Sequence, residues 1–327
     1  MKFDAPLLGA LPDAARNARE VEDAGYDGVF TFEGPHDPFF PLALAAEHTE
    51  RIDLATAIAV AFARNPMTLA NIGYDLQLLS KGRFVLGLGS QIRPHIERRF
   101  SMPWSHPAAR MREMTQAIRA IWDAWQDGTP LRFEGEFYRH TLMTPFFDPG
   151  PNPYGRARIW LAGVGPRMTE VAGEVADGFL VHPFCTERYL REHIRPALER
   201  GHAAAGGARD GFEIAFPTMT VIGDTDEETA AAERDIRSRI AFYGSTPAYA
   251  PVLDVMGWGE LHPELNRLSK EGRWPEMVRL VPEDMIDAFA VRGTRATIAD
   301  AAQERYGGLV DRVALTGESG LLQQAMS

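Results

Sequence analysis

Eight apolar runs of strand length, separated by segments of helical character, constrain this sequence of 327 residues more than any other feature. Most runs are continuously apolar rather than alternating, which is typical of parallel strands that helices cover on both faces. They span residues 2–8, 27–32, 53–60, 83–89, 158–163, 177–183, 212–222 and 311–317. The pattern predicts an α/β protein, either a closed (β/α)8 barrel or a doubly wound open sheet, because the two share this local alternation.

Helix signals fill the intervals between the runs. Residues 65–82 begin with Asn-Pro, typical of an N-cap followed by the first helical residue, and carry apolar side chains at spacings of three and four. Helices are also predicted over 12–25 and 107–125, and a stripe of methionine and tryptophan in the latter indicates core packing. Two segments, 127–158 and 244–282, do not fit the alternation and are predicted to be insertions that cover a site.

Charge and cysteine content exclude several classes of protein. The formal net charge of −11 argues against a general nucleic-acid-binding or membrane-binding surface, since both partners would repel it. The single cysteine, Cys185, excludes an internal disulfide and a thiolate zinc cluster, and no motif of a metal hydrolase or serine hydrolase is present. The N-terminal residues do not form a signal-peptide core, and the apolar stretch Leu54–Ala63 is too short to span a bilayer, so we expect a cytoplasmic protein without a metal.

Two glycine turns follow apolar strands. The stretch "RFVLGLGSQIRPH" has Gly87 and Gly89, but Ile92 stands where a dinucleotide-binding fingerprint requires its third glycine. We expect these two glycines to let a flat ring approach the backbone. The second turn, Gly163-Val164-Gly165, precedes Pro166 and Arg167 and is either a phosphate cradle at a helix N-terminus or a simple strand-to-helix turn.

Polar side chains follow several other predicted strands, as in barrels that assemble a site from many strand ends. Glu33, His36 and Asp37 follow the second strand, and His182 and Cys185 follow the sixth. Each is a weak signal alone, because a single histidine near a strand end is more often structural and Cys185 has no obvious base. A basic cluster after the fourth strand is either a solvated helix face or a pocket for an anionic cofactor. Its members are Arg93, His95, Arg98 and Arg99.

The sequence resembles the luciferase-like monooxygenase superfamily, and within it the oxidoreductases that depend on the deazaflavin coenzyme F420. The most specific segments are "DLATAIAVAFARNPMTLA", "LSKGRFVLGLGSQIRPHIERRFSMPW" and "LAGVGPRMTEVAGEVADGFLVHPF", in matching order and spacing. The resemblance implies one bacterial luciferase-like (β/α)8 TIM-barrel domain over residues 1–327, with insertions near 127–158 and 244–282. It also implies a homodimer.

The resemblance further implies which residues contact the cofactor. In that family the third strand ends in a bulge with a non-proline cis peptide behind the ring, and Ala57 and Ile58 match it here. The loop after the fourth strand and the phosphate-binding turn after the fifth supply the other contacts. The matching residues are Ser90, Gln91, His95, Gly163, Val164, Gly165 and Arg167.

The matching catalytic residues depart from the family's pattern. F420 enzymes of this family often carry an Asp-His pair directly after the second strand. This chain has Glu33 in the carboxylate position, followed by Gly34-Pro35, so that His36 is displaced by two residues. An acid that some relatives carry after the fourth strand corresponds to Ile92. We expect His36 to transfer the proton, with Glu33 orienting it or acting in its place.

The resemblance implies hydride transfer between C5 of coenzyme F420 and a small organic substrate. The protein would supply orientation, proton transfer and exclusion of water. A monooxygenase that uses reduced FMN on the same barrel is the main alternative, and a non-catalytic flavin-binding protein is the second. Neither nucleic acid nor a membrane is expected as a partner.

Overall fold

The computed structural model describes residues 1–316, whose contacts divide the chain into two compact units. The larger unit comprises Lys2–Leu180 and Ala197–Glu213. The smaller unit comprises Val181–Pro196 and the chain from Ile214 onward, together with Met1. In the described residues, no helix has both the length and the apolar character needed to cross a membrane.

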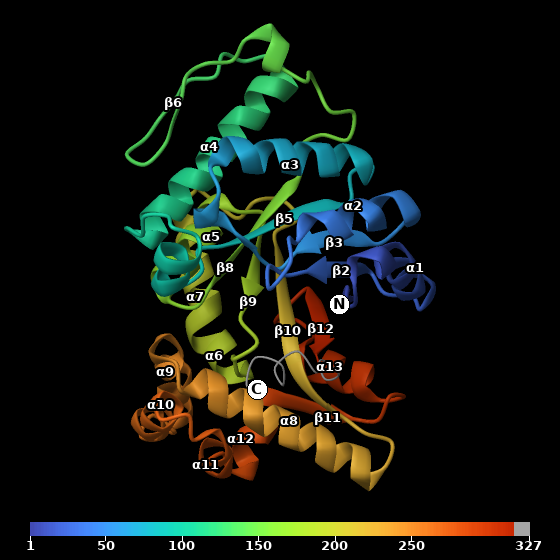
Figure 1. The fold of residues 1–327 in the computed structure, drawn as a ribbon, viewed down its shortest axis with the longest axis vertical. Helices are drawn as coiled ribbons and strands as arrows, with labels where there is room; N and C mark the ends of the chain where they lie inside the picture. The colour runs from blue at the N-terminus through green and yellow to red at the C-terminus, as the bar shows by residue number, and fades with distance from the viewer. Residues whose placement is uncertain (317–327) are drawn as a thin grey trace. The chain divides into compact units, whose positions relative to one another are not determined.

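A sheet of parallel strands forms the centre of the larger unit (Figure 1). Its neighbouring strands, in spatial order, are β1 (Lys2–Pro6), β2 (Gly28–Thr31), β3 (Asp53–Thr56), β5 (Phe84–Gly89), β8 (Arg158–Gly163) and β9 (Gly178–Val181). The two-residue strand β4 (Ala59–Val60) pairs with the end of β5, so the predicted third strand is interrupted at residues 57 and 58. All residues of β5 and β9 are buried, as their unbroken apolar sequences predict.

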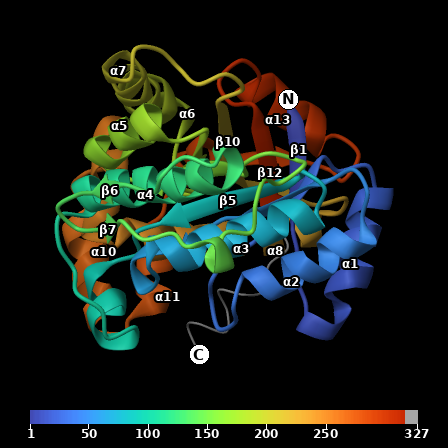
Figure 2. The ribbon, with the colours of Figure 1, turned by 90° about the horizontal axis from the view of Figure 1, so that it is seen from above.

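Helices connect these strands and pack in a row, each against the next, from α1 to α5 (Figure 2). The helices are α1 (Ala14–Asp23), α2 (Phe39–His48), α3 (Pro66–Leu79), α4 (Pro107–Asp127), α5 (Pro166–Val175) and α7 (Arg195–Ala204), with short turns η1 (Leu11–Asp13), η2 (Ala61–Ala63) and η3 (His95–Arg99). The Asn65 side chain accepts a hydrogen bond from the backbone of Thr68, which confirms the predicted N-cap of α3. The methionine and tryptophan stripe of α4 is buried, as predicted, and Trp122 donates to the carbonyl of Ala70 in α3.

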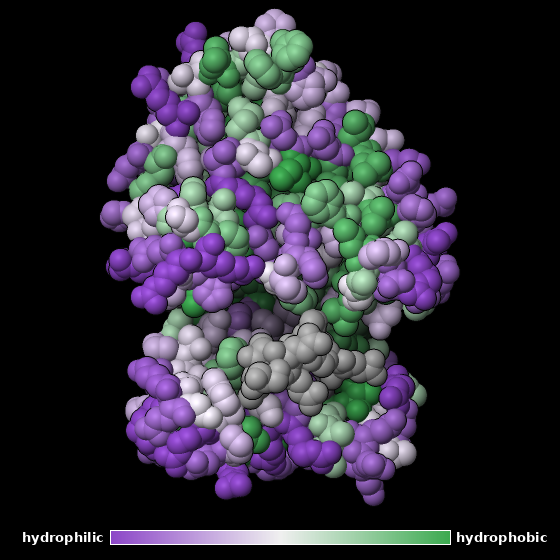
Figure 3. Space-filling model, in the orientation of Figure 1, coloured by the Kyte–Doolittle hydropathy of each residue, from purple (hydrophilic) through white to green (hydrophobic). Residues whose placement is uncertain are grey.

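The segment predicted as the first insertion contains a small hairpin, β6 (Phe133–Glu134) with β7 (Arg139–His140), and the turn η4 (Pro145–Phe147). The carboxylate of Glu113 in α4 accepts hydrogen bonds from three successive backbone N–H groups of the hairpin, at residues 136–138. Leu142, Phe146 and Phe147 are exposed, and Figure 3 shows apolar surface at the upper end of the molecule, where Figure 1 places this segment. The turn of the hairpin is therefore fixed to α4, and the exposed apolar side chains lie in the segment that follows the hairpin.

In the smaller unit, β10 (Glu213–Ile222) lies between β11 (Ala290–Gly293) and β12 (Arg312–Thr316), all parallel. Its helices are α6 (Glu187–Tyr189), α8 (Asp226–Gly244), α9 (Ala250–Met256), α10 (Leu261–Lys270), α11 (Trp274–Arg279), α12 (Glu283–Phe289) and α13 (Ile298–Tyr306), with the turns η5 (Leu190–Ile194) and η6 (Pro247–Tyr249). The predicted second insertion is thus largely helical. All eight predicted runs contain a strand, although residue 317 of the last run lies outside the described residues.

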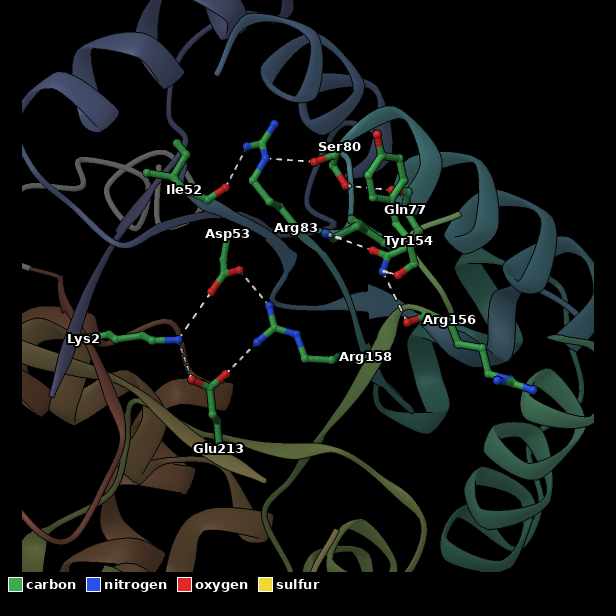
Figure 4. Close-up of polar contacts among 11 residues, drawn as sticks. Lys2, Ile52, Asp53, Gln77, Ser80, Arg83, Tyr154, Arg156, Arg158 and Glu213 are labelled. Carbon is green, nitrogen blue, oxygen red and sulfur yellow. Dashed lines mark hydrogen bonds and ion pairs between the residues drawn. The ribbon is translucent and has the colours of Figure 1, made fainter. Parts of the chain in front are cut away.

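A ring of alternating charges lies at the N-terminal ends of the strands in the larger unit (Figure 4). Arg158 donates to Asp53 Oδ1 at 2.7 Å and to Glu213 Oε2 at 2.9 Å. Lys2 Nζ completes the ring, 2.9 Å from Glu213 Oε1 and 3.7 Å from Asp53 Oδ2. These ion pairs occupy the N-terminal ends of the strands, and in a barrel of this kind a ligand binds at the opposite, carboxyl ends.

Candidate functional site

The residues predicted to form the site all belong to the larger unit, where they follow the carboxyl ends of β2, β3, β5 and β8. Parallel strands deliver their following loops to the same edge of a sheet, so these four loops share one edge. The contacts between the loops then decide which side chains are fixed and which remain available to a ligand.

The first element is the bulge, which we define as residues Ala57 and Ile58 between β3 and β4. The peptide bond between them is cis, as the resemblance predicts. Backbone hydrogen bonds join it to the end of β2: Ala57 N donates to Thr31 O at 2.6 Å, and Glu33 N donates to Ile58 O at 3.0 Å. The bulge is therefore held by the segment that carries the predicted catalytic residues.

The glycines of β5 have a different purpose from the one expected. A Cβ on Gly87 would lie 1.7 Å from the carbonyl oxygen of Thr56, and a Cβ on Gly89 would lie 2.9 Å from the side chain of Ile58. Thr56 Oγ1 also donates to Gly87 O at 2.7 Å and accepts from Gly87 N at 2.9 Å. The expectation that both glycines admit a flat ring is therefore wrong for this structure, because protein atoms of β3 and the bulge occupy the space beside them.

Glu33 is bound on the side of the bulge and not to the neighbouring histidine. Its Oε2 accepts from Val60 N at 2.7 Å and from Arg64 Nη1 at 2.6 Å, and its side chain is only 6% exposed. His36 is exposed, and within residues 1–316 no hydrogen bond joins it to Glu33. These contacts therefore do not support a role of Glu33 in orienting His36 directly.

The loop after β5 contains the next three predicted residues. Ser90 Oγ donates to Gln91 O, and Gln91 adopts a left-handed backbone with φ of 60° while its own Oε1 accepts from Ile92 N. This side-chain bond helps a non-glycine residue to hold that conformation. His95 begins η3 and is exposed, as a residue that contacts a ligand must be before the ligand binds.

Two arginines of the basic cluster after β5, Arg93 and Arg99, make different kinds of contact. Arg93 pairs with Glu97 at 2.9 Å one helical turn away, which is the behaviour of a solvated helix face. Arg99 Nη2 instead donates to Gly34 O at 2.6 Å and so ties the loop after β5 to the loop after β2. The cluster is therefore partly a surface ion pair and partly a link between the two loops.

The turn after β8 leaves backbone donors open at the start of α5. Gly165 is the N-cap, no side chain caps the helix, and no atom lies within 4 Å of the position where a Cβ of Gly165 would stand. Among residues 1–316, neither Val164 N nor Gly165 N donates to a protein acceptor. The backbone of Gly163 packs closely against Met168, since a Cβ on Gly163 would lie 2.7 Å from Met168 Cγ. With Arg167 exposed beside it, the turn fits a phosphate group, which oriented N–H groups and the helix dipole attract.

A half-buried histidine and a half-buried tyrosine form a separate polar pair in the smaller unit. Phe184 N donates to His182 Nδ1 at 3.0 Å, so the neutral ring carries its proton on Nε2, which lies 3.0 Å from the Tyr249 hydroxyl. The two rings stack at 4.4 Å, and the edge of Tyr243 meets His182 at 4.9 Å. Burial lowers the pKa of His182 from 6.5 to about 3. Tyr249 lies in the predicted second insertion, and no sequence pattern predicts its contact with His182.

The remaining candidates are accounted for briefly. Burial raises the pKa of the Cys185 thiol, which agrees with the inert role expected for it. In the part of the chain that the structure describes, no group of three His, Cys, Asp or Glu residues could hold a metal ion. Arg64, which binds Glu33, was not predicted from the sequence. An arginine between an apolar strand and an N-cap forms no distinctive sequence pattern.

Known proteins resemble this chain in sequence and in fold. The sequence model of the family described as luciferase-like monooxygenase matches residues 4–312. The chain is 58% identical over 313 residues to the uncharacterized protein Rv1360 of Mycobacterium tuberculosis, covering 96% of this chain and 92% of that protein. It is 28% identical over 266 residues to an F420-dependent glucose-6-phosphate dehydrogenase of Nakamurella multipartita, covering 78% of this chain and 76% of that protein.

Among solved structures, the coenzyme F420-dependent tetrahydromethanopterin reductase of Methanopyrus kandleri superimposes with a TM-score of 0.78 at 22% sequence identity, covering 99% of this chain and 96% of that chain. At that identity the likeness concerns the fold alone. The chain adopts the (β/α)8 TIM-barrel fold of the bacterial luciferase type, as the sequence predicts, and not the doubly wound alternative.

Proposed function

Because the chain belongs to the luciferase-like monooxygenase family, we propose that it is an oxidoreductase that uses coenzyme F420 to transfer a hydride to or from a small organic substrate. The observation that carries the proposal is the open N-terminus of α5, whose glycine turn offers free backbone N–H groups to a phosphate beside the bulge and the exposed loop after β5. The relatives whose names include F420 favour this cofactor over FMN.

Each predicted contact residue receives a part in this proposal. The turn Gly163–Gly165 and Arg167 hold the phosphate, the bulge Ala57–Ile58 supports one face of the ring, and the loop after β5 contacts the ring from the side through Ser90, Gln91 and His95. The exposure of His95 and Arg167 supports these roles, since among residues 1–316 neither side chain has a hydrogen-bonded protein partner that would have to be displaced.

Bound F420 supplies the hydride-transfer chemistry, which no protein side chain can supply alone. The protein orients the substrate, excludes water and moves one proton, and we assign that proton to the imidazole of His36. His36 is exposed, which leaves its side chain accessible to a ligand. Glu33 is less suited to donate a proton to substrate, because its Oε2 already accepts two hydrogen bonds.

We further propose that the protein acts in the cytoplasm as a homodimer on small molecules and requires neither nucleic acid, membrane nor metal. The net charge of −11 supports the absence of polyanionic partners.

Competitive binding tests the choice of cofactor. The purified protein should quench the fluorescence of F420 at low micromolar concentrations or below and bind FMN more weakly. A preference for FMN would replace the proposal by a reduced-FMN monooxygenase. Tight binding of either cofactor without turnover of any substrate would favour the non-catalytic alternative.

Replacement of His36 by alanine tests the proton-transfer role. His36→Ala should lower turnover, followed at the absorbance of oxidised F420, far more than it weakens F420 binding. Unchanged turnover would remove His36 from the mechanism.

A further inference from the structure

Arg64 connects two segments of the site that are distant in the sequence. Its Nη1 donates to Glu33 Oε2 at 2.6 Å and to Val60 O at 3.1 Å, while its Nη2 lies 3.3 Å from Asp37 Oδ2. The side chain is 16% exposed, and its guanidinium lies 5.3 Å from the ring centre of Phe39. One guanidinium therefore holds the exit of the bulge, the end of β2 and the start of α2.

The partners of Arg64 hold the same segments through further bonds. Glu33 binds both the bulge and the strand after it, since its backbone N–H donates to Ile58 O and its carboxylate accepts from Val60 N in β4. Asp37 Oδ1 accepts from Phe39 N at 2.8 Å, at the start of α2. Glu33, which precedes His36, and Asp37 and Phe39, which follow it, are thereby fixed. Among residues 1–316, no bond of this network involves His36 itself.

Charge and geometry make arginine suited to this position. Two carboxylates approach one guanidinium, whose planar fork presents separate N–H groups to each of them. Because Glu33 is nearly excluded from water, its pairing with Arg64 is worth more than an exposed ion pair. Loss of Arg64 would leave a buried carboxylate with one backbone donor, next to a second carboxylate. A lysine would retain the charge but could not serve both carboxylates with the same geometry.

We propose that Arg64 is a positioning residue that couples the bulge to the loop carrying His36, so that one side chain sets both the affinity for the cofactor ring and the placement of the proton-transfer group. The inference rests on the proposed function. Arg64 does not contact the reacting atoms; it acts through Glu33, Val60 and Asp37.

Arg119 provides a matched control. Its side chain is 17% exposed, its Nη2 donates to Asp177 at 2.7 Å, and its Nε donates to Val175 O at 3.1 Å. It thus resembles Arg64 in burial, carboxylate partner and carbonyl partner, but its partners immediately precede β9, at the N-terminal end of a strand.

The experiment compares the full-length wild type with Arg64→Met, Arg64→Lys and Arg119→Met. For each, F420 affinity is measured by fluorescence quenching, the absorption maximum of bound F420 by difference spectroscopy, and Tm by circular dichroism. Arg64→Met should weaken F420 binding about tenfold or more and displace the absorption maximum of the bound cofactor. Arg64→Lys should recover only part of both effects. Arg119→Met should lower Tm without changing affinity or spectrum.

The outcomes separate this inference from the proposed function. If wild type binds F420 and Arg64→Met binds it with unchanged affinity and spectrum, the role of Arg64 is overturned while the proposed function stands. Equal loss of affinity in Arg64→Met and Arg119→Met also overturns it, since the effect would then be general destabilisation. If wild type prefers FMN, the same comparison is made with FMN, and binding of neither cofactor overturns both ideas. Should Arg64→Met not fold, Asp37→Asn removes one charge and leaves the Glu33 contacts in place; it should weaken binding and shift the spectrum in the same direction, and unchanged values would refute the coupling.

Discussion

Acidification should destabilise this protein partly through His182. The pKa of this residue is about 3 in the folded chain and 6.5 in an unfolded one. Between these values the unfolded chain binds a proton that the folded chain does not, so the free energy of unfolding falls as the pH falls from 6.5 toward 3. The slope for one proton is at most about 1.4 kcal/mol per pH unit, which gives a loss of about 2.5 kcal/mol between about pH 6 and about pH 4. Since the ring retains some contact with solvent, this is an upper limit.

Carboxylates also titrate over this range, so the contribution of His182 has to be measured as a difference between variants. Urea unfolding of wild type and His182→Gln at both pH values isolates it, because glutamine keeps an amide donor for Tyr249 but cannot be protonated. The stability advantage of wild type over the variant should shrink by up to about 2.5 kcal/mol at the lower pH.

Nitrogen chemical shifts provide an independent assay of the same reasoning. At about pH 5 the imidazole of His182 should be neutral, with its proton on Nε2, because Nδ1 accepts from Phe184 N. A charged ring at this pH would refute the argument from burial. An acid loss of stability that is identical in wild type and His182→Gln would refute the argument from linkage.

Two further predictions concern packing. Arg158→Met opens the charge ring and removes a guanidinium that pairs with two partly buried carboxylates, so it should cost about 1–3 kcal/mol, measured by urea unfolding at low salt. Intact stability would show that the ring contributes only surface charge. Gly87→Ala would place a Cβ 1.7 Å from Thr56 O and should lower the free energy of unfolding by about 1–3 kcal/mol or more. The new Cβ of Gly165→Ala would have no atom within 4 Å beyond its chain neighbours, so this variant should keep its Tm while it binds F420 more weakly. Equal Tm changes in the two alanine variants would contradict the different surroundings of these glycines.

The strands could be predicted because each is a short apolar run that helices cover on both faces, and the sequence of β5 shows this most clearly. Where the prediction failed, the cause was short length or mixed composition. β11 has only four residues and follows α12 directly, so no turn signal separates them. The second predicted insertion was recognised only as a segment that does not fit the alternation, although α10 within it spans ten residues and is strongly amphipathic.

The site could be predicted at the level of loops and not at the level of contacts. Strand ends locate Glu33 and the turn at Gly163–Gly165, because the topology of parallel strands determines where loops emerge. The break at Ala57–Ile58 came only from the family resemblance, since neither residue is a glycine or proline. The partners of Glu33 depend on which side chains of β4 and its exit approach it in three dimensions, and no local pattern in the sequence encodes that.

The glycines of β5 show how such contacts depend on one another. Gly87 and Gly89 are required because Thr56 O and the side chain of Ile58 occupy the positions where Cβ atoms would stand. The bulge can press against β5 in this way only if something holds it from the other side, and Glu33 does so through Ile58 O and Val60 N. The bulge is therefore held between β5, where glycines leave room for it, and the segment after β2, which contributes the carboxylate of Glu33. A substitution of Gly89 or of Glu33 should therefore displace Ala57 and Ile58. We expect the effects of two such substitutions on the free energy of cofactor binding to be non-additive, whereas the effects of substitutions outside this contact should be additive.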